Sequence, residues 1–410
     1  MPARAPPSHG GGADMLALVE RVASHRAVEH DSALEWVSML ADEVGPRRPT
    51  SEAERTAAEL VRERLAAAGM DARLEGFKGY STFAAPLGLG IALALAPALL
   101  PPERRVLRSL LATGAAAALL GEGGLVHTPL SDLLSRRPSQ NVVAEIDPQG
   151  EAKRTVCLMC HLDTSRSGLL FHPRTVRFLN PFLRVLGAAG VAQATEPVAG
   201  GHPVGRRILG AARALLALGG GLMLERELRG EDVPGANDNA SGVAVAANLA
   251  LERATDPLEH TRLVFLATGC EESGLLGSQA FLRSRDTKGW LFVNFDNVGG
   301  DATLRYVTRE GVGTRWDADP LLVALAGRIA DQRPELGLEP SDGPIGLTYD
   351  ASPVLARGGR AITFVAGDGG VIPNYHWPTD TADNVDPSAL TRALGVGREM
   401  LARIDRGEAG

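Results

Sequence analysis

Carboxylate and imidazole side chains stand at the ends of several short apolar runs in this 410-residue chain. The run TVCLMC, for example, leads directly into His161 and Asp163. A lone histidine or aspartate in a loop is usually a turn or helix-capping residue, but the repetition of this pattern indicates a shared site. The pattern gives seven candidates for such a site: His161, Asp163, Asp238, Glu271, Glu272, Asp296 and His376.

These side-chain types are the oxygen and nitrogen ligands of zinc. In hydrolases with two zinc ions roughly 3.5 to 4 Å apart, one carboxylate can bridge both ions. Two histidines and three acidic residues would suffice, because three carboxylates and a bridging hydroxide balance the charge of two divalent cations. Without a metal, carboxylates gathered in this way would repel one another and take up protons.

Apolar strands alternate with helices over most of the chain, and this alternation predicts the elements that position the candidates. Apolar strands in such an order favour a largely parallel sheet that is covered on both faces, with its chemistry at the carboxyl ends of the strands. Ser51 followed by Glu54 predicts a capping box at the start of one helix. Strands are predicted at 71–77, 141–146, 155–159, 263–267, 291–295 and 361–365, and helices at 51–68, 240–254, 275–284 and 387–404.

Two long apolar segments do not fit this alternation. Residues 84–126 form a hydrophobic helical hairpin broken by PPERR, and residues 178–224 form a second pair of apolar stretches interrupted by Arg184 and Arg213. Each stretch is near or below the roughly 17 to 25 residues of a membrane span. Arginines at the turn of the first hairpin, such as Arg104, disfavour crossing a bilayer. Buried or interface-forming helices and membrane hairpins both stay open as interpretations.

Composition excludes several classes of protein. A net charge of -7, a pI near 5.8 and the lack of long basic runs disfavour nucleic-acid binding. Three cysteines, Cys157, Cys160 and Cys270, are an odd and low number that favours reduced thiols and a cytoplasmic location. Residues 1–14 have no apolar core behind their arginines, so a disordered tail is predicted and no signal peptide.

Five motifs in a fixed order now give a resemblance to a known family. With HLD, DNASG, CEESGLLGS, the aspartate of NFDN and the histidine of YHWPTD, the chain resembles the M28 family of zinc metallopeptidases, the co-catalytic di-zinc aminopeptidases. The resemblance implies a three-layer α/β/α sandwich with a mixed, largely parallel sheet of about eight strands. It also implies one catalytic domain over 15–410, with hydrophobic helical-hairpin insertions at about 84–126 and 165–234.

The resemblance also implies a role for each ligand. Asp238 bridges the two metals, His161 and Asp296 complete one site, and Glu272 and His376 complete the other. Glu271 is then the general base, which acts on the metal-bridging hydroxide. The resemblance further implies a cis peptide bond between Asp238 and Asn239. From its spacing, Asp163, two positions after His161, can point to the same side of an extended segment and accept the imidazole N–H. Asp380 is either placed similarly behind His376 or is a turn residue before Thr381.

One departure from the family concerns the substrate. The usual Ser-Asp-His run before the last strand is here Tyr349-Asp350-Ala351. Substrate contacts therefore do not carry over, and Asp350 and Tyr375 are only candidates for wall residues of the cleft.

The predicted function is an aminopeptidase that hydrolyses the N-terminal peptide bond of peptides with two Zn²⁺ ions, or with Co or Mn, which accept the same ligands. Alternatives are a glutaminyl-cyclase-like enzyme and a non-catalytic scaffold of the same fold. A peptide is the expected partner, and homo-oligomer formation and membrane association through the hairpins stay open.

Overall fold

A mixed eight-stranded sheet forms the centre of the computed structural model, which describes residues 33–101, 103–134, 136–341 and 347–409. The strands are β1 (Asp71–Gly79), β2 (Arg137–Ile146), β3 (Arg154–His161), β4 (Thr261–Thr268), β5 (Leu291–Phe295), β6 (Leu304–Val307), β9 (Leu338–Ser341) and β10 (Arg360–Ala366). Their order in the sheet is β1-β2-β4-β3-β5-β10-β6-β9. The predicted fold class is confirmed, and the tail predicted for residues 1–14 lies outside the described residues.

The four central strands, β4, β3, β5 and β10, are parallel neighbours. Their carboxyl ends therefore lie at one edge of the sheet, with His161 of β3 opposite Thr268 of β4. Nearly every residue of these strands is buried, as expected where helices cover both faces. β2 runs antiparallel to β1 and β4, and β6 runs antiparallel to β10.

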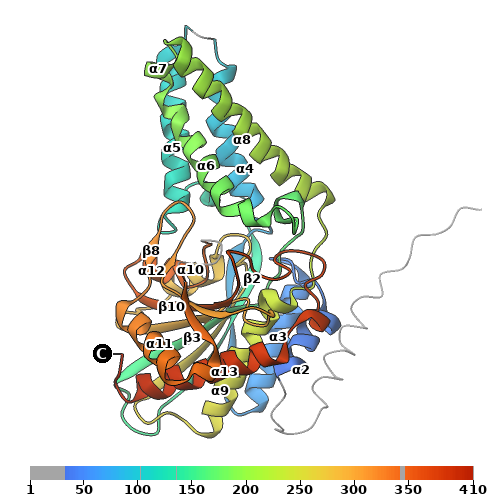
Figure 1. Cartoon of the computed structure of the whole chain (residues 1–410), viewed down its shortest axis with the longest axis vertical. Coiled ribbons are helices and arrows are strands. Elements are labelled where there is room, and N and C mark those ends of the chain that lie inside the picture. Colours follow the sequence, from blue (N-terminus) through green and yellow to red (C-terminus); the bar gives the residue numbers. More distant parts are fainter. Residues whose placement is uncertain (1–32, 102, 135, 342–346, 410) are drawn as a thin grey trace, which may run out of the picture.

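Helices on the two faces of the sheet bury alternate residues of the same strands (Figure 1). Val156 and Leu158 of β3 belong to the larger core, and Cys157 and Met159 belong to the smaller core on the opposite face. All three cysteines are buried and free, and the cytoplasmic location inferred from them stays a prediction. The larger core takes in α2 (Ala33–Ser38), α3 (Glu52–Ala67), α9 (Ser241–Thr255), α11 (Pro320–Gln332) and α13 (Pro387–Asp405), and the smaller core α10 (Leu276–Arg283) and α12 (Ser352–Ala356).

Half of the predicted capping box forms at the start of α3, since the Ser51 amide donates to the Arg48 carbonyl and not to Glu54, which instead holds a loop of the sheet edge. Ser51 Oγ accepts a hydrogen bond of 3.1 Å from the Glu54 amide, as expected at an N-cap. The Glu54 carboxylate accepts hydrogen bonds from the amides of Thr50 and Cys270 and from the hydroxyl of Ser139. Because Cys270 directly precedes Glu271, the start of α3 fixes the backbone from which that side chain projects.

The two apolar insertions come together in one four-helix bundle, which projects from the α/β part (Figure 1). Its interior is apolar and includes Ile91, Ala115, Leu186 and Leu216. Both insertions leave the carboxyl ends of strands, β1 and β3, which point in the same direction in the sheet. The bundle consists of α4 (Ala84–Leu95), α5 (Arg105–Gly123), α6 (Leu179–Ala192) and α8 (Pro203–Arg229).

Candidate metal centre

The carboxyl edge of the sheet brings five of the predicted residues to one place. His161 ends β3, Asp296 directly follows β5, and Glu272 lies four residues after β4. Asp238 lies in the irregular turn Ala236–Ala240 that leads into α9, and His376 lies in the loop after β10. All five side chains are buried.

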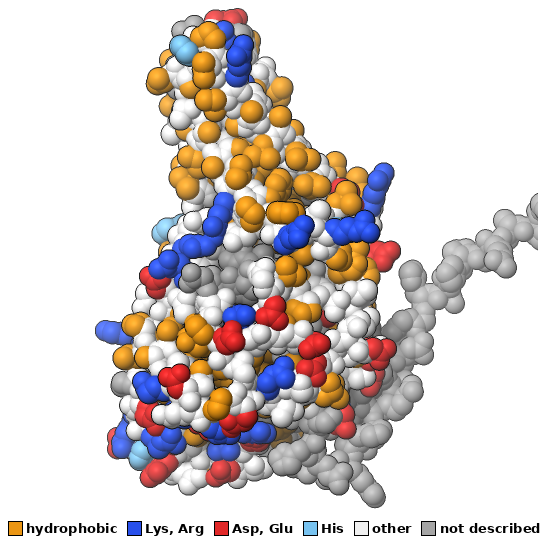
Figure 2. Space-filling view, viewed as in Figure 1, with side chains coloured by type: hydrophobic (Ala, Val, Ile, Leu, Met, Phe, Trp, Pro, Cys, Tyr) orange, Lys and Arg blue, Asp and Glu red, His pale blue; other side chains and the backbone are white. Residues whose placement is uncertain are grey.

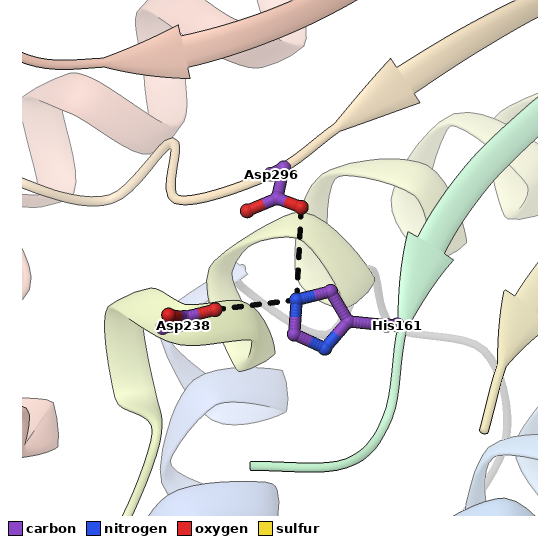
Figure 3. A group of neighbouring side chains, drawn as sticks. All are labelled: His161, Asp238 and Asp296. Carbon is purple, nitrogen blue, oxygen red and sulfur yellow. Dashed lines mark ion pairs between the residues drawn. The ribbon is translucent and has the colours of Figure 1, made fainter. Parts of the chain in front are cut away.

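His161, Asp238 and Asp296 form the first group (Figure 3). The Nε2 atom of His161 lies 3.2 Å from Asp238 Oδ1 and 3.7 Å from Asp296 Oδ2. Figure 3 shows both carboxylates directed at the same nitrogen of the imidazole ring. One cation between these three atoms would have ligands from three different elements.

Asp238, Glu272 and His376 form the second group. The Nε2 atom of His376 lies 3.2 Å from Asp238 Oδ2 and 3.1 Å from Glu272 Oε1. Asp238 therefore directs one carboxylate oxygen to each group. Within each group the candidate ligand atoms all lie within 4.8 Å of one another.

The hydrogen bonding and charge of these groups fit a bound cation. Asp238 Oδ2 and Glu272 Oε1 are buried and make no hydrogen bond to the described residues. Burial opposes protonation of His376, but Glu272 and Asp238 outweigh it and raise the pKa of this imidazole to about 9. Burial raises the pKa of Asp296 to about 7. Protons would thus collect where divalent cations could neutralise the same carboxylates, and the imidazole and carboxylate donors suit zinc.

The peptide bond between Asp238 and Asn239 is cis, as the family resemblance implied. The Asn239 side chain ties this turn to the strand that carries Asp296, because it donates to the Phe295 carbonyl and accepts from the Asn297 amide. Gly242 is required beside it, since a Cβ atom there would lie 2.3 Å from both Asn239 Oδ1 and the Phe295 carbonyl.

Asp163 supports the site differently from the prediction. The His161 Nδ1 atom lies 3.0 Å from the backbone oxygen of Asp163 and 3.9 Å from its carboxylate. The carboxylate instead accepts hydrogen bonds of 3.0 Å from the amides of Glu271 and Glu272. The expected carboxylate–imidazole bond is therefore wrong, because the imidazole faces the backbone oxygen of Asp163 while its carboxylate faces the two amides of the glutamate turn.

Asp380 also holds backbone. It was expected behind His376, but its carboxylate accepts hydrogen bonds from the amides of Asn237 at 2.7 Å and Asp238 at 3.0 Å. The His376 Nδ1 atom makes no hydrogen bond to the described residues. Asp380 therefore fixes the turn of Asp238, and the expected contact with His376 is wrong.

Arg47 is a supporting residue that the sequence analysis did not single out. Its buried guanidinium donates to five backbone carbonyls, and the distances are between 2.6 and 2.9 Å. The acceptors include Leu162, next to His161, and Gly235, three residues before Asp238. No side-chain pattern in the sequence signals this role, because all five acceptors are backbone carbonyls. The five acceptors are Leu40, Gly45, Leu162, Pro234 and Gly235.

A small pocket with an empty volume of about 210 Å³ opens onto the two groups. Glu271 and Tyr375 line it, and the Tyr375 ring stacks on the His376 ring with centroids 3.8 Å apart. Tyr349 also lines it, and its buried hydroxyl makes no hydrogen bond to the described residues. Asp350 lies behind this wall, where it accepts a hydrogen bond from Thr268 at 2.5 Å. Of the two predicted wall residues, the structure thus places only Tyr375 on the pocket.

The fold is that of the zinc aminopeptidases. The structure of BSAP, a zinc aminopeptidase from Bacillus subtilis, is similar with a TM-score of 0.55 and 17% identity, over 93% of this chain and 96% of that one. The glutaminyl cyclase of Tannerella forsythia shares the fold as well, with a TM-score of 0.51 and 13% identity over 92% of this chain and 99% of that one.

The sequence comparison is more specific than the fold. Residues 222–400 match the model of peptidase family M28, which confirms the resemblance to this family. The chain is also 31% identical over 184 residues to the probable lipoprotein aminopeptidase LpqL of Mycobacterium tuberculosis. That alignment covers 38% of this chain and 37% of LpqL, so the chain spans just over a third of the relative's length.

Asp238→Ala should abolish metal binding at both groups, because its two oxygens are directed to one group each. The measurement is metal content of the purified protein by elemental mass spectrometry. The matched control is Asp256→Ala, since the Asp256 side chain is exposed, and it should keep the wild-type content. Full metal content in Asp238→Ala would refute the shared role.

A second prediction concerns Glu310, a buried carboxylate behind Tyr349. Ser352 and Thr363 donate hydrogen bonds of 2.6 Å to it, and Ser352 Oγ also accepts from the Tyr349 amide. Burial raises the pKa of Glu310 from 4.5 to about 7. Between these two pKa values the folded state therefore holds a proton that the unfolded state has lost. The free energy of unfolding falls as the pH rises through this window, from 4.5 to about 7.

In Glu310→Gln this contribution should be absent. Relative to the variant, the wild type should lose up to about 3 kcal/mol of stability between the acid and the alkaline side of the window. Chemical denaturation at constant metal content on both sides of the window measures the difference. If the free energy of unfolding changed equally with pH in the two proteins, Glu310 would be ionised in the folded state at both pH values, which would contradict the prediction.

Proposed function

We propose that the protein is a zinc-dependent aminopeptidase with two metal ions. The observation that carries this proposal is the position of Asp238, whose two oxygens lie between two histidine-containing groups. Asp238, His161 and Asp296 would hold one ion, and Asp238, Glu272 and His376 the other. Zinc bound there would supply a Lewis acid for the scissile carbonyl and for the attacking water.

Glu271 is the proposed general base. Its side chain lines the pocket and remains partly exposed, while that of the neighbouring Glu272 points into the second group. Burial, opposed by His161, raises the pKa of Glu271 well above its usual range. A carboxylate of raised basicity can take a proton from the attacking water and return it to the leaving amine. The amide hydrogen bonds to Asp163 hold the glutamate turn during both transfers.

The charge of the pocket favours a free amino terminus as the recognised end of the substrate. Glu271 lines the pocket outside the two ligand groups, so it keeps its negative charge when metal ions neutralise Glu272 and Asp296, and the described lining residues include no lysine or arginine. An N-terminal ammonium group complements this acidic lining, whereas a C-terminal carboxylate would meet no cationic side chain from it.

Glu271→Gln should keep its metal and lose at least about two orders of magnitude in kcat, the usual contribution of a positioned acid or base. Release of the N-terminal residue from aminoacyl chromogenic amides, followed with and without a chelator, measures the rate. The matched control is Glu259→Gln, an exposed glutamate, which should stay fully active. Unchanged kcat in Glu271→Gln would remove Glu271 from this role.

The same assay separates the proposed activity from that of a glutaminyl cyclase. A peptide with N-terminal glutamine would lose this residue in an aminopeptidase but would be converted to the pyroglutamyl peptide by a cyclase. Mass spectrometry of the product distinguishes the two outcomes. Turnover of neither substrate by the metal-loaded protein would favour the non-catalytic scaffold.

Tyr349→Phe should lower kcat about 10-fold or more with little change in KM or metal content. Its hydroxyl has no hydrogen-bond partner among the described residues and lines the pocket, so it can donate to the carbonyl oxygen as negative charge develops. Tyr306→Phe, a change at a mostly buried tyrosine of β6, is the control and should leave kcat unchanged. Wild-type kinetics in Tyr349→Phe would contradict this contribution.

A further inference from the structure

The surface of the four-helix bundle is unusually apolar. Large hydrophobic side chains are exposed on all four helices, and Figure 2 shows them spread over the visible face of the projection. Several are more than half exposed, which is rare for contiguous leucine and isoleucine side chains on a soluble surface. The exposed set includes Leu93, Val106, Leu107, Leu110, Leu111, Leu120, Val185, Val191, Val204, Ile208, Leu218, Leu224 and Leu228.

Charged side chains are concentrated at the two ends of the bundle. α4 carries no charged residue, and neither residues 109–121 of α5 nor residues 214–224 of α8 do. Arg213 lies nearer the middle of α8, but it pairs with Glu196 at 3.1 Å, and Arg108 pairs with the same carboxylate. Exposed arginines stand at both ends of the bundle. Those at the end next to the α/β part are Arg174, Arg177, Arg184 and Arg229. Those at the far end are Arg104, Arg206 and Arg207.

The length of the apolar zone matches a lipid layer. The stretch of α8 between Arg207 and Glu225 has 17 residues, of which only the paired Arg213 is charged, and it corresponds to about 26 Å at 1.5 Å per residue. The hydrocarbon core of a bilayer is about 30 Å thick. α8 is long and apolar enough to cross a membrane, yet only 22% of its most apolar window is buried. A core helix of a soluble domain would be mostly covered by its own protein.

The distribution of the exposed side chains favours lipid over a second copy of the chain. Ile208 and Leu224 point to sides of α8 about 160° apart. A dimer interface would use one side and leave the other polar, whereas lipid surrounds a bundle on all sides. Close helix contacts at Gly90, Gly190 and Gly219, where a Cβ would lie within 3.0 Å of a leucine side chain, are typical of packing inside membranes.

We propose that the four-helix bundle inserts into a lipid bilayer from its far end, with Arg174, Arg177 and Arg229 at the phosphates of the headgroups. Anionic lipids attract such arginines electrostatically. Both insertions leave the carboxyl edge of the sheet. Near the start of the second insertion, the Phe171 ring packs against the His376 ring with centroids 4.4 Å apart. The metal centre would therefore lie near the membrane surface. If the proposed function holds, its substrates are peptides with their amino terminus near the bilayer.

Flotation of the full-length protein with vesicles tests the insertion. The vesicles contain phosphatidylcholine alone or mixed with phosphatidylglycerol, and the wild type should float with both and more completely with the anionic mixture. The double variant Leu110→Arg/Leu218→Arg should reduce the floating fraction by about 10-fold or more, because charges in the hydrocarbon region are costly. The matched control Leu34→Arg/Leu321→Arg changes two exposed leucines of the α/β part and should float like the wild type.

Wild-type protein that stays in the aqueous layer would overturn the proposal, and so would equal flotation of the Leu110→Arg/Leu218→Arg variant. Light scattering after size exclusion adds one more outcome. A dimer that does not float, and that this variant dissociates, would assign the surface to a second copy instead. Flotation of Glu271→Gln should equal that of the wild type, so a failure of the proposed catalysis cannot be mistaken for a failure of insertion.

A single labelled cysteine gives a measurement that does not depend on the folding of the double variant. The three native cysteines are buried, so Leu218→Cys can be labelled selectively with an environment-sensitive dye. Brominated lipids should quench this label and leave a label at Leu321→Cys unquenched. Absence of quenching at both positions in the presence of vesicles would also overturn the insertion.

Discussion

The concentration of buried carboxylates at one edge of the sheet is the constraint on which the rest of the structure depends. Asp238 shares one ligand group with Asp296 and the other with Glu272, each within 4.8 Å, and Glu271, Asp163 and Asp380 lie directly beside these groups. Such a cluster is unfavourable unless cations or hydrogen-bond donors balance it. The fold supplies both kinds of balance: two imidazoles face the ligand carboxylates, while backbone amides serve the carboxylates behind them.

Arg47 connects this charge balance to the backbone. Burial lowers its pKa to about 10, while Asp380, Asp163 and Asp238 oppose that change by favouring the charged form. Three of its hydrogen bonds go to carbonyls beside His161 and Asp238, and the other two go to the nearby Leu40 and Gly45. Since all five acceptors are backbone carbonyls, Arg47 acts on the carboxylates only through space. The same cation therefore both fixes the loops and lowers the electrostatic cost of the carboxylates. Sequence spacing could not show this, because the acceptors beside His161 and Asp238 are backbone atoms more than a hundred residues away.

The sheet and the ligands could be predicted because both follow from local patterns. Each of the six predicted strands is present, and each ligand follows a run that is apolar on both faces or lies in a motif with a fixed spacing. β6 and β9 were not predicted, since they are only four residues long and lie toward one side of the sheet, and the helix α11 between them was missed as well. The partners of Asp163 and Asp380 were wrong for a related reason: hydrogen bonds to backbone amides leave no trace in side-chain spacing. Joining of two separate apolar insertions into one bundle is likewise a tertiary property.

The two insertions begin and end at neighbouring points of the fold. The first connects β1 and β2, which are hydrogen-bonded neighbours with Gly79 opposite Arg137, and Tyr80 and Ser131 hydrogen-bond across its ends. The second is closed where the Val233 amide donates to the Ser165 carbonyl. Chain ends that lie this close can be joined by a short turn. The bundle is therefore attached like an interchangeable module, which a lineage could acquire, exchange or lose without rebuilding the sheet that carries the ligands.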